Sequence, residues 1–186
     1  MEQQQDNRAA KLVLVIGTNG TGKTTILKNI IQNSLERSLI ITPDCVEWLE
    51  YEENKLKTKA DYFFEGINRH IYLEDSLKKI DKYTRGTLIF DDCRSYLKAS
   101  TAQEVRNLII RRRQRQIDIF AVGHGFTEIP PVFFTFATDI ILFRTTDNII
   151  RRKDCLKDYE AVLQLQQRIN KKSVEDPHYY EILKFS

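Results

Sequence analysis

Eight residues near the start of the chain have the types and the spacing of a phosphate-binding loop. Residues 17–24 read GTNGTGKT, which satisfies the pattern G-x-x-x-x-G-K-[ST]. In such a loop the glycines let successive backbone N–H groups converge on phosphate oxygens, and the helix that follows offers its positive end. We expect Lys23 to reach the β- and γ-phosphates of ATP and the Thr24 hydroxyl to bind Mg²⁺. The expected nucleotide-binding residues are Gly17, Thr18, Asn19, Gly20, Thr21, Gly22, Lys23, Thr24 and Thr25.

The segments on both sides of this loop fit the motif. Residues 11–16 form an apolar run with β-branched residues, typical of a buried strand, and apolar residues recur at helical spacing from Thr25 to Leu35. A strand, a glycine loop and a helix therefore follow one another in the order that the motif needs. A chance glycine turn before a helix is the weaker interpretation.

A pair of acidic residues ends a second apolar strand. Residues 87–90 read TLIF and are followed by Asp91 and Asp92, which is the Walker B pattern when it lies downstream of a phosphate loop. We predict that Asp91 holds Mg²⁺ and that Asp92 is the general base that polarises the attacking water. The alternative is that the acid pair only caps the next helix.

A histidine follows a further apolar strand. Residues 117–123 form this strand and His124 ends it. In ATPases with an additional strand between the two nucleotide-binding strands, a polar residue at this point contacts the γ-phosphate or the lytic water. We predict that His124 is this sensor, and the alternative is a histidine that only hydrogen-bonds within a turn.

The helix expected over residues 102–116 ends in a basic run. Arg111, Arg112 and Arg113 belong to this run, and arginines near the C-terminus of a helix interact favourably with its dipole even when they are only solvated. The two other interpretations are an arginine finger and a strip that faces DNA. The sequence alone leaves all three open.

The remaining pattern predicts an α/β protein with three layers and a mostly parallel central sheet, of the P-loop NTPase type. Residues 1–10 are expected to be a flexible lead, and residues 11–186 a single domain. Within it, residues 38–42 and 139–144 read as strands and residues 154–169 as a helix. Residues 44–86 read as an elaborated connection with a helix near residues 76–83, and the tail over residues 170–186 as the source of an edge strand. Inside the connection, Trp48 is interpreted as a core or flap anchor rather than a base-stacking residue, and His70 as a structural or solvated residue rather than a ligand.

Composition and charge place the chain among proteins of the cytoplasm. Of its 186 residues, 41% are hydrophobic and 30% charged, as in ordinary globular proteins. We find neither an apolar run of membrane-spanning length nor a secretory signal. The three cysteines, Cys45, Cys93 and Cys155, form no C-x-x-C pair. The net charge is −2 over residues 1–93 and +5 over residues 94–186, which is compatible with contact to nucleic acid.

Taken in order, these features resemble the additional-strand P-loop ATPases. The run from Arg111 to Pro131, with its basic helix end, strand, His124 and prolines, looks most like the HerA/FtsK-like branch. That branch includes viral DNA-packaging ATPases and the ATPase domain of zonular-occludens-toxin-like phage proteins. The resemblance covers roughly residues 11–150. Members often have Glu after the Walker B Asp and Gln at the sensor, where this chain has Asp92 and His124.

This resemblance implies a motor subunit that hydrolyses ATP and moves double-stranded DNA. Several copies would form a homo-oligomeric ring in the cytoplasm, the host cytoplasm if the gene is viral, with a capsid protein or a nuclease as a further partner. Each subunit would lend an arginine to the site of its neighbour. The candidates for this finger are Arg111, Arg112, Arg113, Arg144 and Arg151.

Two other functions remain open at this point. A small-molecule or nucleotide kinase fits the size of the chain, with the arginines of residues 111–115 as a lid over the transferred phosphate. An assembly subunit that binds ATP without turnover is the other, because Asp92 is shorter by one methylene than the usual glutamate.

Overall fold

The computed structural model describes residues 10–43 and 46–185 of the chain. The lead expected over residues 1–10 lies outside the described residues except for Ala10, and Cys45 lies outside them as well. Residue 44 of the expected connection and residue 186 of the expected tail also lie outside the described residues.

The described residues form one eight-stranded sheet with the order β3-β4-β2-β5-β6-β1-β7-β8. Every neighbouring pair is parallel except β7 and β8, which are antiparallel. The strands are β1 (Leu12–Ile16), β2 (Ser38–Thr42), β3 (Glu52–Glu53), β4 (Ile67–Ile71), β5 (Gly86–Phe90), β6 (Ile117–Gly123), β7 (Asp139–Phe143) and β8 (Tyr180–Lys184).

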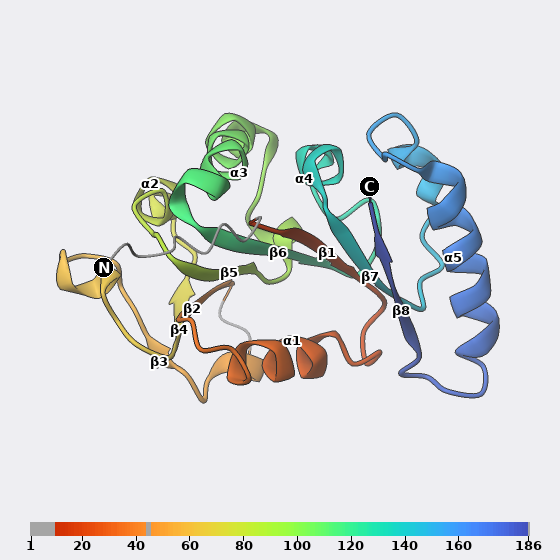
Figure 1. Ribbon diagram of the computed structural model, residues 1–186, viewed down its shortest axis with the longest axis horizontal. Helices are drawn as coiled ribbons and strands as arrows, with labels where there is room; N and C mark the ends of the chain where they lie inside the picture. The colour runs from red at the N-terminus through yellow and green to blue at the C-terminus, as the bar shows by residue number, and fades with distance from the viewer. Residues whose placement is uncertain (1–9, 44–45, 186) are drawn as a thin grey trace, which may run out of the picture.

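Helices cover both faces of this sheet (Figure 1). They are α1 (Lys23–Gln32), α2 (Ser76–Ile80), α3 (Ala102–Arg115), α4 (Pro131–Phe136) and α5 (Tyr159–Lys172). Figure 1 shows α1 on one face, α2, α3 and α4 on the other, and α5 beside β7 and β8. The predicted three-layer α/β architecture with a mostly parallel sheet is therefore confirmed.

The core is divided by the sheet into two clusters because successive side chains of a strand point to opposite faces. In β1, Leu12 and Leu14 belong to the larger cluster with residues of α3, α4 and α5, whereas Val13 and Val15 pack with Leu27 of α1. A strand that is buried on both faces needs apolar residues on both, so its sequence does not alternate between apolar and polar residues. This is why β1 and β7 read as continuous apolar runs in the sequence.

The sheet brings three chemically important strand ends to one edge. Parallel neighbours have their carboxyl ends on the same side, and β6 lies between β5 and β1. The glycine loop after β1, the acid pair after β5 and His124 after β6 must therefore lie next to one another. The additional strand expected between the two nucleotide-binding strands is β6.

The connection over residues 44–86 contains two strands that the sequence did not predict. Strand β4 reads INRHI, and its polar residues Asn68 and His70 point into the structure while Ile67 and Ile71 are half-buried. The usual relation between apolarity and burial is thus reversed. Such an inversion is possible because His70 is satisfied by the carbonyl of Asn54 at 2.7 Å and by the Ser76 hydroxyl at 2.8 Å. His70 is structural, as predicted, and the expected helix is α2.

Helices α5 and α1 have boundaries that differ from the expected ones. Helix α5 begins at Tyr159 and not near Asp154, because the Asp158 carboxylate caps it by accepting a hydrogen bond from the Ala161 N–H at 3.0 Å. Helix α1 begins at Lys23, directly after Gly22, and ends at Gln32. The edge strand expected in the tail is β8.

Candidate functional site

The glycine loop between β1 and α1 is fixed to the ends of the neighbouring strands. The Gly17 N–H donates to the carbonyl of Gly123, the last residue of β6, at 3.2 Å, and the Thr18 N–H donates to the Arg144 carbonyl directly after β7 at 2.9 Å. Gly20 and Gly22 have φ values of 75° and 98°, in the left-handed region that side chains disfavour. The loop can therefore turn sharply into α1 only with glycine at these positions.

The first turn of α1 is left free to bind an anion. Its N-terminus has no side-chain cap, and no acidic residue lies in the first turn. The first N–H groups of a helix have no intrahelical partner, and they carry the positive end of the dipole. Together with the loop amides they form a cradle that suits phosphate oxygens.

The Lys23 ammonium lies inside this cradle and has three acceptors. It donates to the carbonyls of Gly17 at 2.6 Å and Thr18 at 3.0 Å, and its Nζ lies 3.3 Å from Nδ1 of His124. Burial lowers the pKa of Lys23, and the nearby carboxylates, first that of Asp91, act in the opposite direction. A buried cation held only by neutral acceptors is well prepared to bind a phosphate in their place.

Asp91 is held by the only tryptophan of the chain. The Trp48 indole N–H donates to Oδ2 of Asp91 at 2.6 Å, and the Trp48 side chain is fully buried. Burial raises the pKa of Asp91, and the hydrogen bond from Trp48 counteracts this effect. Trp48 is thus the core anchor that the sequence predicted, and it also orients the acid of the Walker B strand.

Thr24 and Asp91 fit the predicted Mg²⁺ ligands by their chemistry. Both line the same pocket, and a hydroxyl with a carboxylate oxygen is a donor set that Mg²⁺ prefers. Trp48 occupies one oxygen of Asp91 and leaves the other for an ion or its water.

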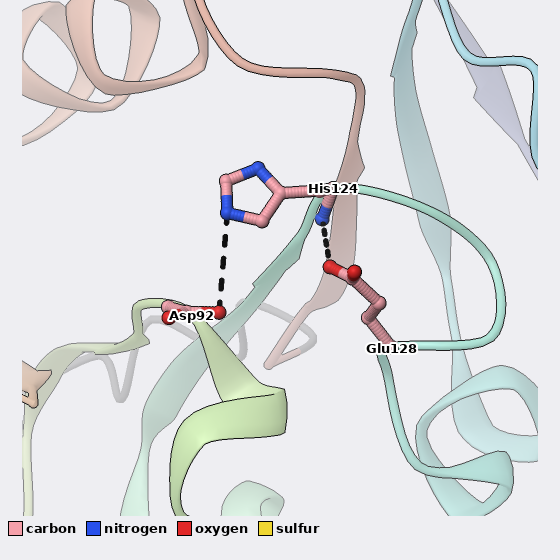
Figure 2. Close-up of side chains that lie close together, drawn as sticks. All are labelled: Asp92, His124 and Glu128. Atoms are coloured by element: carbon pink, nitrogen blue, oxygen red, sulfur yellow. Dashed lines mark hydrogen bonds and ion pairs between the residues drawn. The ribbon is translucent and has the colours of Figure 1, made fainter.

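Asp92, His124 and Glu128 form a second polar group beside the loop (Figure 2). Oδ1 of Asp92 lies 3.9 Å from Nε2 of His124. The Glu128 carboxylate accepts a hydrogen bond from the backbone N–H of His124 at 2.8 Å and forms an ion pair with Arg94 at 3.2 Å. Figure 2 shows the imidazole directed at Asp92, while Glu128 approaches the backbone of the same residue.

A pocket of about 560 Å³ is lined by Lys23, Thr24, both acids after β5 and His124. This volume is in the range of small-ligand sites, roughly 300–1,000 Å³. Its lining residues are Asn19, Gly20, Thr21, Gly22, Lys23, Thr24, Thr25, Glu47, Asp91, Asp92, Val122, Gly123, His124 and His178. The structure thus brings together most of the predicted loop, both acids and the predicted sensor.

The arginines of α3 lie far from this pocket. The end of α3 is next to the start of β5, because the Arg115 carbonyl accepts from the Arg85 N–H at 2.9 Å, and this is the edge opposite to the loop. Arg111 pairs with Asp81 at 3.3 Å, Arg112 is buried, and Arg113 is exposed. These arginines form no lid over the pocket of their own chain, and the kinase alternative loses the feature that suggested it.

Arg144 and Arg151 follow β7, the strand whose carboxyl end borders the glycine loop. Arg144 directly follows β7, and its carbonyl holds the glycine loop through the Thr18 N–H. Arg151 belongs to a short 3₁₀ helix, Ile149–Arg152. Both side chains are exposed.

Four residues of the site were not predicted as such. Trp48 and Glu47 come from the connection after β2, Glu128 from the loop after β6, and His178 from the turn before β8. The one signal in the sequence was the position of Glu128, four residues after His124 and before two prolines. Nothing in the local sequence indicates that Trp48 reaches Asp91, 43 residues away.

Comparison with known proteins gives structural neighbours only. No protein-family model and no curated protein sequence matches the chain. The genome-packaging NTPase B204 of Sulfolobus turreted icosahedral virus 2, in complex with AMP, superposes with a TM-score of 0.72 at 12% identity, over 94% of this chain and 92% of that one.

Two further structures are similar. The DNA-packaging ATPase B204 of Sulfolobus turreted icosahedral virus gives a TM-score of 0.64 at 13% identity, over 94% of this chain and 92% of that one. The N-terminal domain of zonular occludens toxin from Neisseria meningitidis gives 0.54 at 16% identity, over 96% of both chains. This chain has the P-loop NTPase fold. Both kinds of protein that the sequence resembles are among its structural neighbours.

Proposed function

We propose that this chain binds ATP with Mg²⁺ and hydrolyses the bond between the β- and γ-phosphates. The observation that carries this proposal is that Lys23, Asp91 and His124 line one pocket at the end of the glycine loop. The structures of B204 in complex with AMPPCP and with ATPγS, which superpose over 94% of this chain, support a nucleotide as the ligand.

The position of each residue in the pocket determines its proposed role. The loop amides and Lys23 bind the phosphates, and the Lys23 ammonium neutralises charge that develops in the transition state. When it is bound, Mg²⁺ would be held by Thr24 and Asp91 and would neutralise charge on the β- and γ-oxygens. Asp92 and His124 line the same pocket, and in this proposal they lie beside the γ-phosphate, where water must be activated and the phosphate sensed.

At the level of the assembly, we propose a homo-oligomeric ring of the HerA/FtsK-like kind that packages or translocates double-stranded DNA in the cytoplasm. The similarity in fold to B204, a genome-packaging NTPase and DNA-packaging ATPase, supports this role. In the described part of the chain, no helix has the length and apolarity needed to cross a membrane. A capsid protein or a nuclease would be the partner of such a ring.

The test is phosphate release from ATP with Mg²⁺, measured with and without double-stranded DNA at low salt and at several protein concentrations. We expect turnover that rises with protein concentration and with DNA, and that is lost in Lys23→Ala. Lys79→Ala is the matched control, because Lys79 lies on α2 and pairs with Asp75 at 2.8 Å, outside the pocket. ATP binding without turnover under all conditions would contradict the proposal and favour the assembly subunit. Turnover that does not change when DNA is added would contradict the proposed DNA motor but not the proposed ATPase activity.

A further inference from the structure

Lys23 determines which nitrogen of His124 carries the proton. An ammonium group has three donors and no lone pair, and Lys23 directs its donors at two carbonyls and at Nδ1 of His124, 3.3 Å away. Nδ1 must therefore be the acceptor of this contact. A neutral imidazole then has its proton on Nε2, the nitrogen that faces Asp92.

Asp92 has the surroundings of an orienting carboxylate and not of a free base. Its Oδ2 already accepts a hydrogen bond from the Ser95 hydroxyl, and its Oδ1 faces Nε2 of His124 at 3.9 Å. The backbone of Asp92 has φ 48° and ψ 58°, a left-handed conformation that most non-glycine residues disfavour. This turn directs Asp92 toward β6 although Asp91, its neighbour, is bound to Trp48.

The backbone of His124 is fixed from a third direction. Glu128 accepts from the His124 N–H at 2.8 Å and is itself paired with Arg94. Asp92, His124 and Glu128 have ligand atoms within 4.8 Å of one another and could in principle hold a metal ion. Two cations, Lys23 and Arg94, already contact this group, so a hydrogen-bonded network is favoured over a metal site.

From this geometry we propose that His124 is the catalytic base of the reaction and that Asp92 is its positioning residue. The inference rests on the proposed function and assigns to His124 the role that the sequence gave to Asp92. It also explains the shorter acid after Asp91, since a carboxylate that supports a histidine does not need to reach the water.

When ATP enters, Lys23 turns from its acceptors to the phosphates and leaves the Nδ1 lone pair of His124 free. A water oxygen forms a bond to the γ-phosphorus, the bond from this phosphorus to the bridging oxygen breaks, and ADP leaves with the electron pair. The water proton passes to Nδ1. The resulting imidazolium is stabilised through Nε2–H by Asp92, whose contact shortens from the long distance usual in nucleotide-free sites. The proton is then released to solvent.

The first experiment compares His124→Ala and Asp92→Asn with the wild type, by turnover and by ATP affinity. We expect His124→Ala to lose turnover about 10²-fold or more while ATP affinity changes little, and added imidazole to restore part of the loss. Asp92→Asn should lose less, and the double variant should be no worse than His124→Ala, because both residues act in one unit. Lys23→Ala with imidazole is the control that should gain nothing.

Other outcomes separate the two proposals. If Asp92→Asn loses more than His124→Ala, or if the two losses multiply and imidazole has no effect, the assignment is overturned although the protein remains an ATPase. If the wild type itself shows no turnover, the proposed function fails and the inference fails with it.

A second measurement needs no activity. The chain has three histidines, and ¹⁵N NMR of the nucleotide-free protein reports the tautomer of each, with the His124 signals identified by their absence in His124→Ala. We expect the Nε2–H tautomer for His124 in the wild type. A proton on Nδ1 would overturn the proposal whatever the kinetics show.

Discussion

The bond between Trp48 and Asp91 shows how a single side chain can prepare a metal ligand. Asp91 is buried, and burial alone would favour its neutral form. An indole N–H can stabilise the carboxylate without adding a charge that would repel a cation. It also fixes the rotation of the carboxylate, so that one defined oxygen faces the pocket.

We therefore predict that Trp48→Phe weakens the response to Mg²⁺. Phenylalanine keeps most of the ring but cannot donate, and a hydrogen bond to a charged group contributes about 1.5–3 kcal/mol. The Mg²⁺ concentration for half-maximal turnover should rise about tenfold or more, with a smaller change in ATP affinity without metal. Because Trp48 is the only tryptophan, the wild-type fluorescence should also change when Mg²⁺ and ATP bind.

The control for this variant is Tyr51→Phe. Tyr51 packs beside Trp48, with ring centroids 6.1 Å apart, and its hydroxyl accepts a bond from Gln32 at 2.9 Å, away from Asp91. The Tyr51→Phe variant should keep the wild-type dependence of turnover on Mg²⁺ concentration. An unchanged Mg²⁺ dependence in Trp48→Phe would mean that the indole bond has no part in holding the ion.

At the scale of elements, the sequence predicted those strands whose burial and apolarity agree. Strands β1, β2 and β7 are buried throughout, and residue runs such as SLIIT show this directly. Strand β4 was missed because Asn68 and His70 are its buried side chains, and the hydrogen bonds of His70 to Asn54 and Ser76 come from outside the strand. The site follows the same rule: the loop, Asp91, Asp92 and His124 were found from strand ends, whereas Trp48 and Glu128 depend on tertiary contacts.

The edge strand β8 is joined to α5 by a charged contact that should make stability depend on pH. Glu181 accepts from Arg168 at 2.9, 3.0 and 2.6 Å and from the Tyr179 hydroxyl at 2.8 Å. The Arg168 guanidinium in particular lowers the pKa of Glu181 from 4.5 to about 2. A lowered carboxylate pKa stabilises the fold above the unfolded value of 4.5 and ceases to do so as the pH falls through about 2.

We predict that Glu181→Gln lowers the free energy of unfolding at pH 7 by about 1 kcal/mol or less, because the pair is partly exposed and screened by solvent. The difference from the wild type should fall by more than half at pH 3. Urea unfolding at both pH values measures it. Glu175→Gln, at an exposed acid after α5, controls for the loss of one charge and should show no such pH dependence. A difference that grows toward pH 3 would contradict the assigned pair.

At the scale of the whole molecule, the sheet separates two groups of arginines. The end of α3 lies at the amino edge of the strands, whereas Arg144 and Arg151 follow β7, whose carboxyl end borders the glycine loop. A finger must be exposed and free to enter the site of a neighbour. Arg112 is buried and Arg111 is paired with Asp81, so neither meets this condition without rearrangement.

We therefore predict that a finger, if the chain forms a ring, is one of the exposed arginines Arg113, Arg144 and Arg151, and neither Arg111 nor Arg112. Alanine at the finger should reduce turnover about 10³-fold or more while ATP affinity is retained, and Arg111→Ala should behave as the wild type. Acting in trans has a specific consequence: a Lys23→Ala subunit has an intact finger, and the finger variant has an intact loop. Mixing the two inactive proteins should restore turnover, because some sites then combine an intact loop with an intact finger from the next subunit. Turnover that stays absent in every mixture, with oligomers of normal size, would place the arginine in the site of its own chain.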